Sequence, residues 1–126
     1  MKVLFLNPPT FKWFDASRVQ SPKKIKVLWY PIWLSYATAL VRTKHEVRLI
    51  DAPAEDLSCA NVLEICEKFR PQLIVIEVTT PSLTKTINVC EAIAENNEHS
   101  KIVLVGPHAT ALPRETLEAS SAVWGV

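Results

Sequence analysis

The feature that most constrains the fold is a regular alternation of short apolar runs with segments of helical character. The runs are KVLFLN (2–7), EVRLID (46–51), QLIVIEV (72–78), KIVLVG (101–106) and AVWGV (122–126). The first, third and fourth runs are almost continuously apolar, which is typical of strands that are buried on both faces of a parallel sheet. Strict alternation of such strands with helices predicts right-handed βαβ units.

Four helical segments are expected between these runs, at 31–43, 56–70, 81–96 and 113–120. The first is apolar nearly all round, which predicts a well-buried helix. We therefore expect an α/β fold with a five-stranded parallel sheet and helices on both faces. Its expected strand order is the flavodoxin-like 2-1-3-4-5, and the Rossmann order is the alternative.

The size and charge of the chain limit its class. A length of 126 residues predicts one domain, 1–126, and a net charge of +1 argues against nucleic acid as the main partner. No apolar run is long enough to span a bilayer, and the N-terminus lacks the features of a signal peptide, so we expect a cytoplasmic protein. The three cysteines show no paired spacing and are expected to be free, with Cys66 and Cys90 buried on helices.

Ligands of open parallel sheets bind outside the carboxyl ends of the strands. Three loops are expected at that edge: 7–10 (NPPT), 79–82 (TTPS) and 106–110 (GPHAT). The first loop has no glycine, which excludes a dinucleotide fingerprint, and the chain has no P-loop. The hydroxyls of the other two loops have two open interpretations: they cap helix N-termini, or they line a pocket for a polar tail or a phosphate.

A long connection, residues 11–30, does not fit the alternation. It combines five aromatic residues with five basic ones, and a connection of this length is typical of functional or disordered segments. A lid over the strand ends, or a surface for another domain, is the favoured interpretation. Binding of single-stranded nucleic acid is a weaker alternative.

Taken together, the motifs resemble a known family. The stretches KVLFLNPP, YPIWLSYATAL, HEVRLIDA, IVIEVTTPS and IVLVGPHATALPRE occur in the order found in the N-terminal cobalamin-binding domain of cobalamin-dependent radical S-adenosylmethionine (SAM) enzymes. The resemblance covers nearly the whole chain apart from 11–28 and 56–70. It implies that the chain binds cobalamin (vitamin B12), and that it is a domain excised from a longer protein with a C-terminal radical SAM barrel.

The resemblance also implies which residues hold the cofactor. The nucleotide tail would lie against the loops after the third and fourth strands, and the corrin ring would lie over the loop after the first. The implied cofactor-binding residues are Pro8, Pro9, Thr10, Thr79, Thr80, Pro81, Ser82, Gly106, Pro107, His108, Ala109, Thr110 and Gly125. Gly106 would let the backbone approach the tail, so Gly106→Val is expected to block binding and largely retain folding.

The loop after the first strand has no histidine, so the resemblance implies base-off cobalamin without a histidine ligand to cobalt. No residue of the chain is expected to be catalytic or to bind a metal. The C-x-x-x-C-x-x-C cluster motif is absent, which assigns the [4Fe–4S] cluster, SAM and the methyl transfer or related radical chemistry to the longer protein. Where the family commonly has two further glycines, this chain has Lys44 and Val105, and Val126 replaces a glutamate. The alternative is an interaction domain that has lost cobalamin binding and contacts a partner through residues 11–30.

Overall fold

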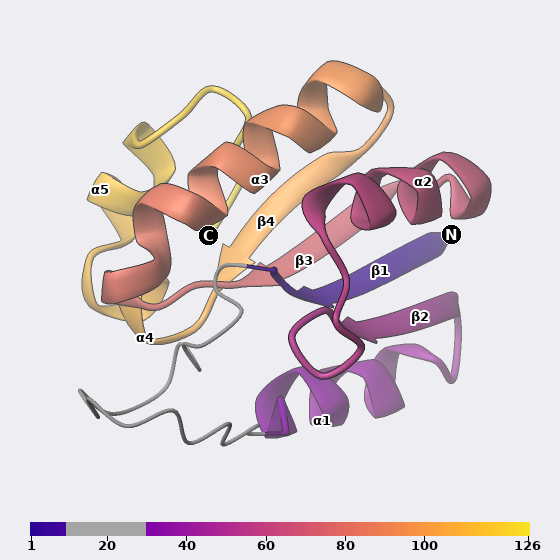
Figure 1. Cartoon of the computed structure of the whole chain (residues 1–126). Coiled ribbons are helices and arrows are strands. Elements are labelled where there is room, and N and C mark those ends of the chain that lie inside the picture. Colours follow the sequence, from indigo (N-terminus) through magenta and orange to yellow (C-terminus); the bar gives the residue numbers. More distant parts are fainter. Residues whose placement is uncertain (10–29) are drawn as a thin grey trace.

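The computed structural model describes residues 1–9 and 30–126. Four parallel strands form its sheet in the order β2-β1-β3-β4 (Figure 1). Their bounds are Lys2–Asn7 for β1, Glu46–Asp51 for β2, Leu73–Glu77 for β3 and Lys101–Val105 for β4. This parallel arrangement and order agree with the expected flavodoxin-like fold and differ from the Rossmann order.

The helices lie on both faces of the sheet, as expected (Figure 1). Their bounds are Ile32–Val41 for α1, Cys59–Phe69 for α2, Leu83–Asn96 for α3, Pro107–Ala111 for α4 and Pro113–Glu118 for α5, with a 3₁₀ turn, η1, at Thr80–Ser82. α2 and α3 cover one face, and α1 lies on the other. Right-handed crossovers explain this division, because the chain moves one way from β1 to β2 and the opposite way from β2 to β3 and β4.

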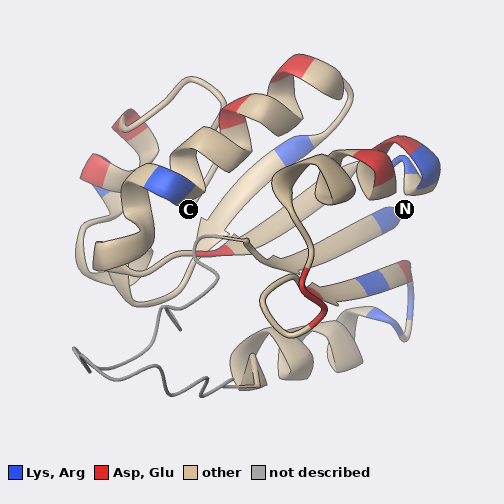
Figure 2. Ribbon diagram, in the orientation of Figure 1, with Lys and Arg blue, Asp and Glu red and all other residues tan. Residues whose placement is uncertain are grey.

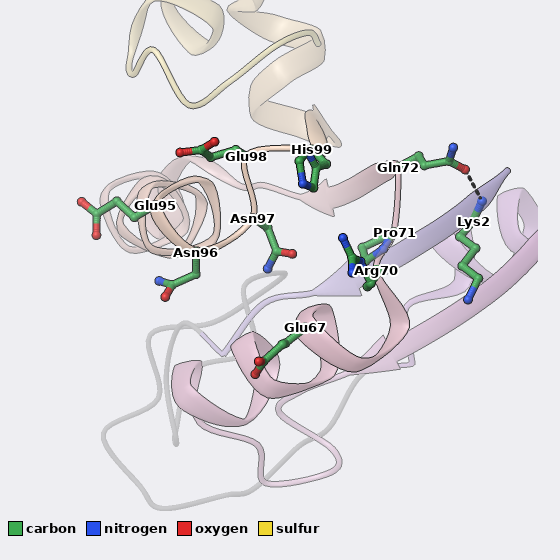
Figure 3. A pocket seen from close by; sticks show the side chains of 10 residues that line it. All are labelled: Lys2, Glu67, Arg70, Pro71, Gln72, Glu95, Asn96, Asn97, Glu98 and His99. Atoms are coloured by element: carbon green, nitrogen blue, oxygen red, sulfur yellow. Dashed lines mark hydrogen bonds between the residues drawn. The ribbon is translucent and has the colours of Figure 1, made fainter.

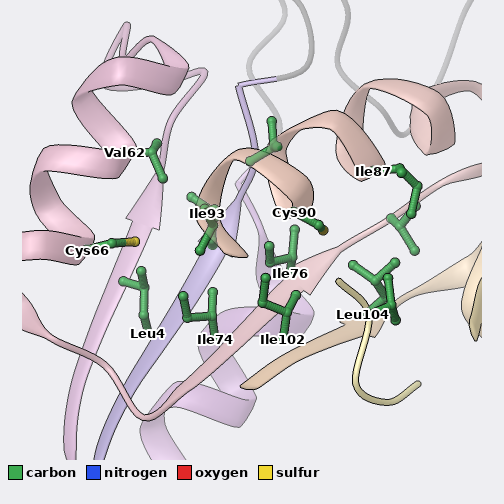
Figure 4. Close-up of a cluster of buried hydrophobic side chains, with 14 of the residues drawn as sticks. Leu4, Val62, Cys66, Ile74, Ile76, Ile87, Cys90, Ile93, Ile102 and Leu104 are labelled. Atoms are coloured by element: carbon green, nitrogen blue, oxygen red, sulfur yellow. The ribbon is translucent and has the colours of Figure 1, made fainter. Parts of the chain in front are cut away.

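The main core lies between the sheet and the α2–α3 face (Figure 4). Alternate residues of the strands point to this face, so that Leu4, Ile74, Ile76 and Ile102 are at most 1% exposed. Cys66 of α2 and Cys90 of α3 pack among them, which confirms the expected buried thiols. The register Glu77↔Val105 aligns the ends of β3 and β4, so the loops that follow both strands begin at the same level.

The prediction of a fifth strand at 122–126 is wrong. Residues 122–126 run beside β4, but they make one isolated parallel bridge, Val103↔Gly125. Leu104 N–H donates to the Gly125 carbonyl at 3.0 Å, and Trp124 N–H donates to the Ile102 carbonyl at 2.8 Å. Two consecutive residues therefore reach the edge of the sheet, which is too short a contact for a strand, and the sheet has four strands.

Two further expectations are corrected. α1 is not well buried, because Leu34 is its single buried residue and large apolar side chains on its outer surface are exposed. The stretch after Gly106 is not a loop, because Pro107–Ala111 form the one-turn helix α4. Residues 10–29 lie outside the described part of the chain, and with them Thr10 and nearly all of the 11–30 segment.

Charged side chains are unevenly distributed over the described residues. Figure 2 shows charged positions on α2, α3 and α5, at the loops and on the strands, while α1 carries none from end to end. No helix within 1–9 and 30–126 has the length and apolarity to cross a membrane.

Candidate functional site

The two predicted hydroxyl-rich segments meet at the carboxyl ends of β3 and β4. Val78 N–H donates to the Val105 carbonyl at 2.8 Å, and the backbone N–H of His108 reaches the Val78 carbonyl at 3.4 Å. A side-chain hydrogen bond joins the segments directly, because Oγ1 of Thr80 lies 3.0 Å from Nδ1 of His108. Residues 79–82 and 106–110 thus form one site at the edge where ligands of parallel sheets bind.

Within the first segment, two hydroxyls serve the local backbone. Ser82 Oγ accepts from the Thr79 N–H at 3.0 Å and lies 3.1 Å from the Thr79 carbonyl, while the two side-chain oxygens are 3.0 Å apart. This reciprocal capping box begins η1 and directs the chain into α3. For these two buried residues, the structure therefore supports the helix-capping interpretation.

His108 is the buried polar centre of the second segment. The side chain is 2% exposed and projects from α4, where Pro107 occupies the first helical position. Its Nδ1 contacts Thr80, while its Nε2 is buried without a hydrogen-bond partner among the described residues. Leaving a buried ring nitrogen without a partner is energetically costly, and this cost sets His108 apart from the capped hydroxyls of the first segment.

Gly106 is required for a reason that differs from the expected one. Its φ of +111° is unfavourable for any residue with a Cβ, and a Cβ built there would lie 2.8 Å from the Val78 carbonyl oxygen. The close approach is therefore to the chain's own backbone at the end of β3. The expectation that Gly106→Val largely retains folding is corrected accordingly, because the side chain would strain and displace β3.

The carboxyl end of β1 lies at the same edge of the sheet. Asn7 Nδ2 donates to Oδ1 of Asp51 at 2.9 Å, which ties the end of β1 to the end of β2. Pro8 is buried and Pro9 is half-buried. The sequence analysis did not predict the Asn7–Asp51 pair. It could have been inferred, because Asn7 and Asp51 are the last residues of two predicted parallel strands that lie side by side.

The remaining predicted residues divide by location. Thr80, Pro81, Pro107 and Thr110 are exposed at the site, and Ala109 is buried beneath it. Gly125 lies apart, beside Val103 in the middle of β4. Thr86 of α3 was not predicted, yet its Oγ1 is buried without a hydrogen-bond partner among the described residues, one turn after Ser82.

Two of the pockets on the described surface can be compared with the predicted residues, and neither coincides with them. One, of about 760 Å³, lies at the amino ends of the strands, on the opposite edge of the sheet (Figure 3). It is lined by Lys2, Glu67, Arg70, Pro71, Gln72, Glu95, Asn96, Asn97, Glu98 and His99. The other, of about 670 Å³, lies between the start of α3 and α4–α5, beside the site. It is lined by Leu83, Ala111, Leu112, Pro113, Arg114, Glu115, Glu118 and Ala119.

Comparison with known proteins identifies the family. The family model described as "B12 binding domain" matches residues 23–126. A protein of Pyrococcus horikoshii described as "Uncharacterized methyltransferase PH0819" is 32% identical over 117 residues, which cover 93% of this chain and 24% of that relative. The chain thus spans about a quarter of the relative's length. No solved structure matches. Since the family model covers most of the chain, including β2–β4 and the candidate site, the chain belongs to the B12-binding domain family.

Proposed function

We propose that this chain holds cobalamin at the carboxyl ends of β3 and β4, with the nucleotide tail against residues 79–82 and 106–110. The observation that carries the proposal is the meeting of residues 79–82 and 106–110 at the carboxyl ends of β3 and β4, joined by the Thr80–His108 contact. A cofactor tail rich in oxygen and nitrogen offers hydrogen-bond partners for the exposed hydroxyls of these segments.

The residues fit such a tail in their chemistry. Thr80 and Thr110 have exposed side chains at the site, and no charged residue occurs within 78–82 or 105–113. Bound cobalamin supplies a cobalt ion that can carry a methyl group. The chain's own contribution is to position the cofactor by hydrogen bonds from the exposed hydroxyls of Thr80 and Thr110, with His108 supporting Thr80 from beneath.

We further propose that the cofactor is held base-off without a histidine ligand to cobalt. The sequence from Asn7 to Tyr30 contains no histidine. His108 is 2% exposed and engages Thr80, which supports a role at the tail rather than at the metal. His45 and His99 precede β2 and β4, at the opposite edge of the sheet.

In a protein of the relative's length, we propose that this domain presents cobalamin to a radical SAM barrel that holds a [4Fe–4S] cluster and SAM and transfers a methyl group. The Pyrococcus horikoshii relative, described as an uncharacterized methyltransferase, supports this proposal. The 126 residues themselves lack the cysteine motif for such a cluster, so the reaction would require additional chain.

Titration with hydroxocobalamin, followed by absorbance and calorimetry, tests the binding. We expect saturable binding with a base-off spectrum that His108→Ala leaves unchanged. Thr80→Val removes one hydroxyl from an exposed side chain and should weaken binding by about 0.5–1.5 kcal/mol. Thr43→Val, which removes an exposed hydroxyl at the C-terminal end of α1, is the matched control and should bind as the original chain does.

Absence of binding at high micromolar cofactor, in a chain shown by circular dichroism to be folded, would contradict the proposal. It would favour the alternative of an interaction domain that has lost the cofactor and contacts a partner through residues 11–30.

A further inference from the structure

Three of the four strands end in a polar residue on the face of the sheet that carries α1. The apolar strand residues that pack beneath α1 on this face are Val3, Phe5, Val47, Leu49, Leu73 and Val75. Because successive strand residues point to opposite faces, the same face continues to Asn7 on β1, Asp51 on β2 and Glu77 on β3. Each of these three residues is the last of its strand, and each is half-buried.

The strand register places the three residues side by side. Asn7 pairs with Asp51 across β1 and β2, and Asn7 Nδ2 donates to Asp51 Oδ1 at 2.9 Å. Leu6 pairs with Ile76 across β1 and β3, so Asn7 and Glu77 are the next residues of these two strands. The strand order therefore sets one amide between two carboxylates along the carboxyl edge of the sheet (Figure 1). We call Asp51, Asn7 and Glu77 the edge row.

The edge row is continuous with the candidate site. Glu77 pairs with Val105 across β3 and β4, and Glu77 Cγ lies 3.3 Å from the position that a Cβ on Gly106 would take. The chain passes directly from Glu77 through Val78 into residues 79–82. The row thus extends the site from β3 across β1 to β2, and its members are held by strands rather than by loops.

The spacing within the row suits a large ligand better than a metal ion. Neighbouring strands lie about 4.8 Å apart, which separates Asp51 on β2 from Glu77 on β3 by about 10 Å. Within residues 1–9 and 30–126, no group of three or more His, Cys, Asp or Glu side chains could hold a metal ion. A ligand that meets both carboxylates must therefore span several strands, as a tetrapyrrole-sized ring does.

We propose that Asp51 and Glu77 select a corrin ring whose side chains are amides over one whose side chains are carboxylates. The inference rests on the proposed function, with the corrin ring over the end of β1. The rim of cobalamin carries primary amides, whose N–H groups need acceptors. An ionised carboxylate accepts about four hydrogen bonds, so Asp51 retains acceptor capacity beside its bond with Asn7. A carboxylate on the ring would instead meet a like charge.

Two corrinoids that both lack the nucleotide tail test the proposal by equilibrium titration. Cobinamide keeps the amides of the ring, whereas cobyrinic acid has carboxylates in their place. We expect the original chain to bind cobinamide measurably, and at least about tenfold more tightly than cobyrinic acid. This comparison needs no substitution in the chain, so it does not depend on the folding of a variant.

Substitutions that remove one negative charge assign the selection to the edge row. Glu77→Gln and Asp51→Asn keep the size and an acceptor oxygen of each side chain, and each should reduce the ratio of the two affinities at least about threefold. Glu98→Gln is the matched control, because it makes the same change at an exposed residue beside the amino end of β4 (Figure 3). It should leave the ratio unchanged.

The outcomes separate this inference from the proposed function. Equal affinity for the two corrinoids, absence of cobinamide binding in a chain that binds hydroxocobalamin, or a ratio that folded Glu77→Gln and Asp51→Asn leave unchanged would overturn the inference alone. A folded chain that binds no corrinoid, hydroxocobalamin included, would contradict the proposed function and the inference with it.

Discussion

At the scale of single residues, Gly106 shows how a backbone requirement can resemble a binding requirement. Its positive φ and its approach to the Val78 carbonyl both serve the turn from β4 into α4. A glycine at this position is therefore necessary for the fold, whether or not a cofactor passes the same turn. Loss of cobalamin binding on substitution of Gly106 would not by itself locate the cofactor.

We predict that Gly106→Ala lowers the free energy of unfolding by about 1–3 kcal/mol through backbone strain alone, with a further loss as the Val78 carbonyl is displaced. Urea denaturation measures the change. Gly125→Ala is the control, because its Cβ would meet Val103 Cγ2 at an ordinary 3.5 Å, and it should cost less than about 1 kcal/mol. Equal effects of the two substitutions would contradict this account of Gly106.

The three cysteines differ in burial, and we expect them to differ in reactivity for that reason. Burial raises the pKa of Cys66 to about 11 and that of Cys90 to about 12, from an ordinary 9.0, and also raises the pKa of the half-buried Cys59. We predict that Ellman's reagent at pH 8 labels Cys59 first and the other two only as the chain unfolds. Rapid labelling of two or three thiols in the folded chain would contradict the prediction.

The same shifts set a pH dependence of stability. Because each buried thiol binds its proton more tightly in the folded chain than in the unfolded chain, the unfolded chain binds fewer protons above about pH 9. The free energy of unfolding should therefore fall as the pH rises from about 9 to about 12. Denaturation curves at several pH values, compared between the original chain and Cys90→Ser, check the direction.

At the scale of elements, the site depends on two short helical turns that follow neighbouring strands. The capping box of Thr79 and Ser82 begins η1, and Pro107 begins α4 directly after Gly106. These turns bring Thr80 and His108 within hydrogen-bonding distance, although the two residues are 28 positions apart in the sequence. The capping hydroxyls therefore shape the site indirectly, by fixing the path of the backbone.

We predict that Ser82→Ala lowers the free energy of unfolding by about 1–3 kcal/mol, because it leaves the buried Thr79 N–H without its acceptor. Ser58→Ala is the comparison. Ser58 also forms a capping box, with Asn61 at the start of α2, but Ser58 is exposed to solvent. Its replacement by alanine should therefore lower the free energy of unfolding by about 1 kcal/mol or less. Urea denaturation of both variants measures the difference, and a neutral Ser82→Ala would contradict the capping role.

At the scale of the whole molecule, the two faces of the sheet are unequal. α2 and α3 cover one face across β1, β3 and β4, while α1 covers part of the other. We predict that Ile74→Ala, on the fully buried face, lowers the free energy of unfolding by about 2–5 kcal/mol. Val75→Ala, one residue further but on the α1 face, should cost well under half as much. Similar losses would mean that the α1 face is as well covered as the other.

Much of this architecture was predictable from the sequence. Runs of Val, Ile and Leu identified β1, β3 and β4, because strands buried on both faces tolerate few polar side chains. Their alternation with helical stripes predicted the parallel sheet and its order, because right-handed crossovers leave few topologies. The two hydroxyl-rich segments at adjacent strand ends were likewise readable, since parallel strands end at one edge.

The tertiary structure decided the rest, because each of the remaining features depends on contacts between distant residues. Exposure of α1 depends on what lies beside it, which periodicity within Ile32–Val41 does not reveal. The number of hydrogen bonds that residues 122–126 make with β4 decided against a fifth strand. The capping roles of Thr79 and Ser82 followed from the distance between these two residues. The role of Gly106 followed from its distance to the Val78 carbonyl. Local sequence specifies neither distance.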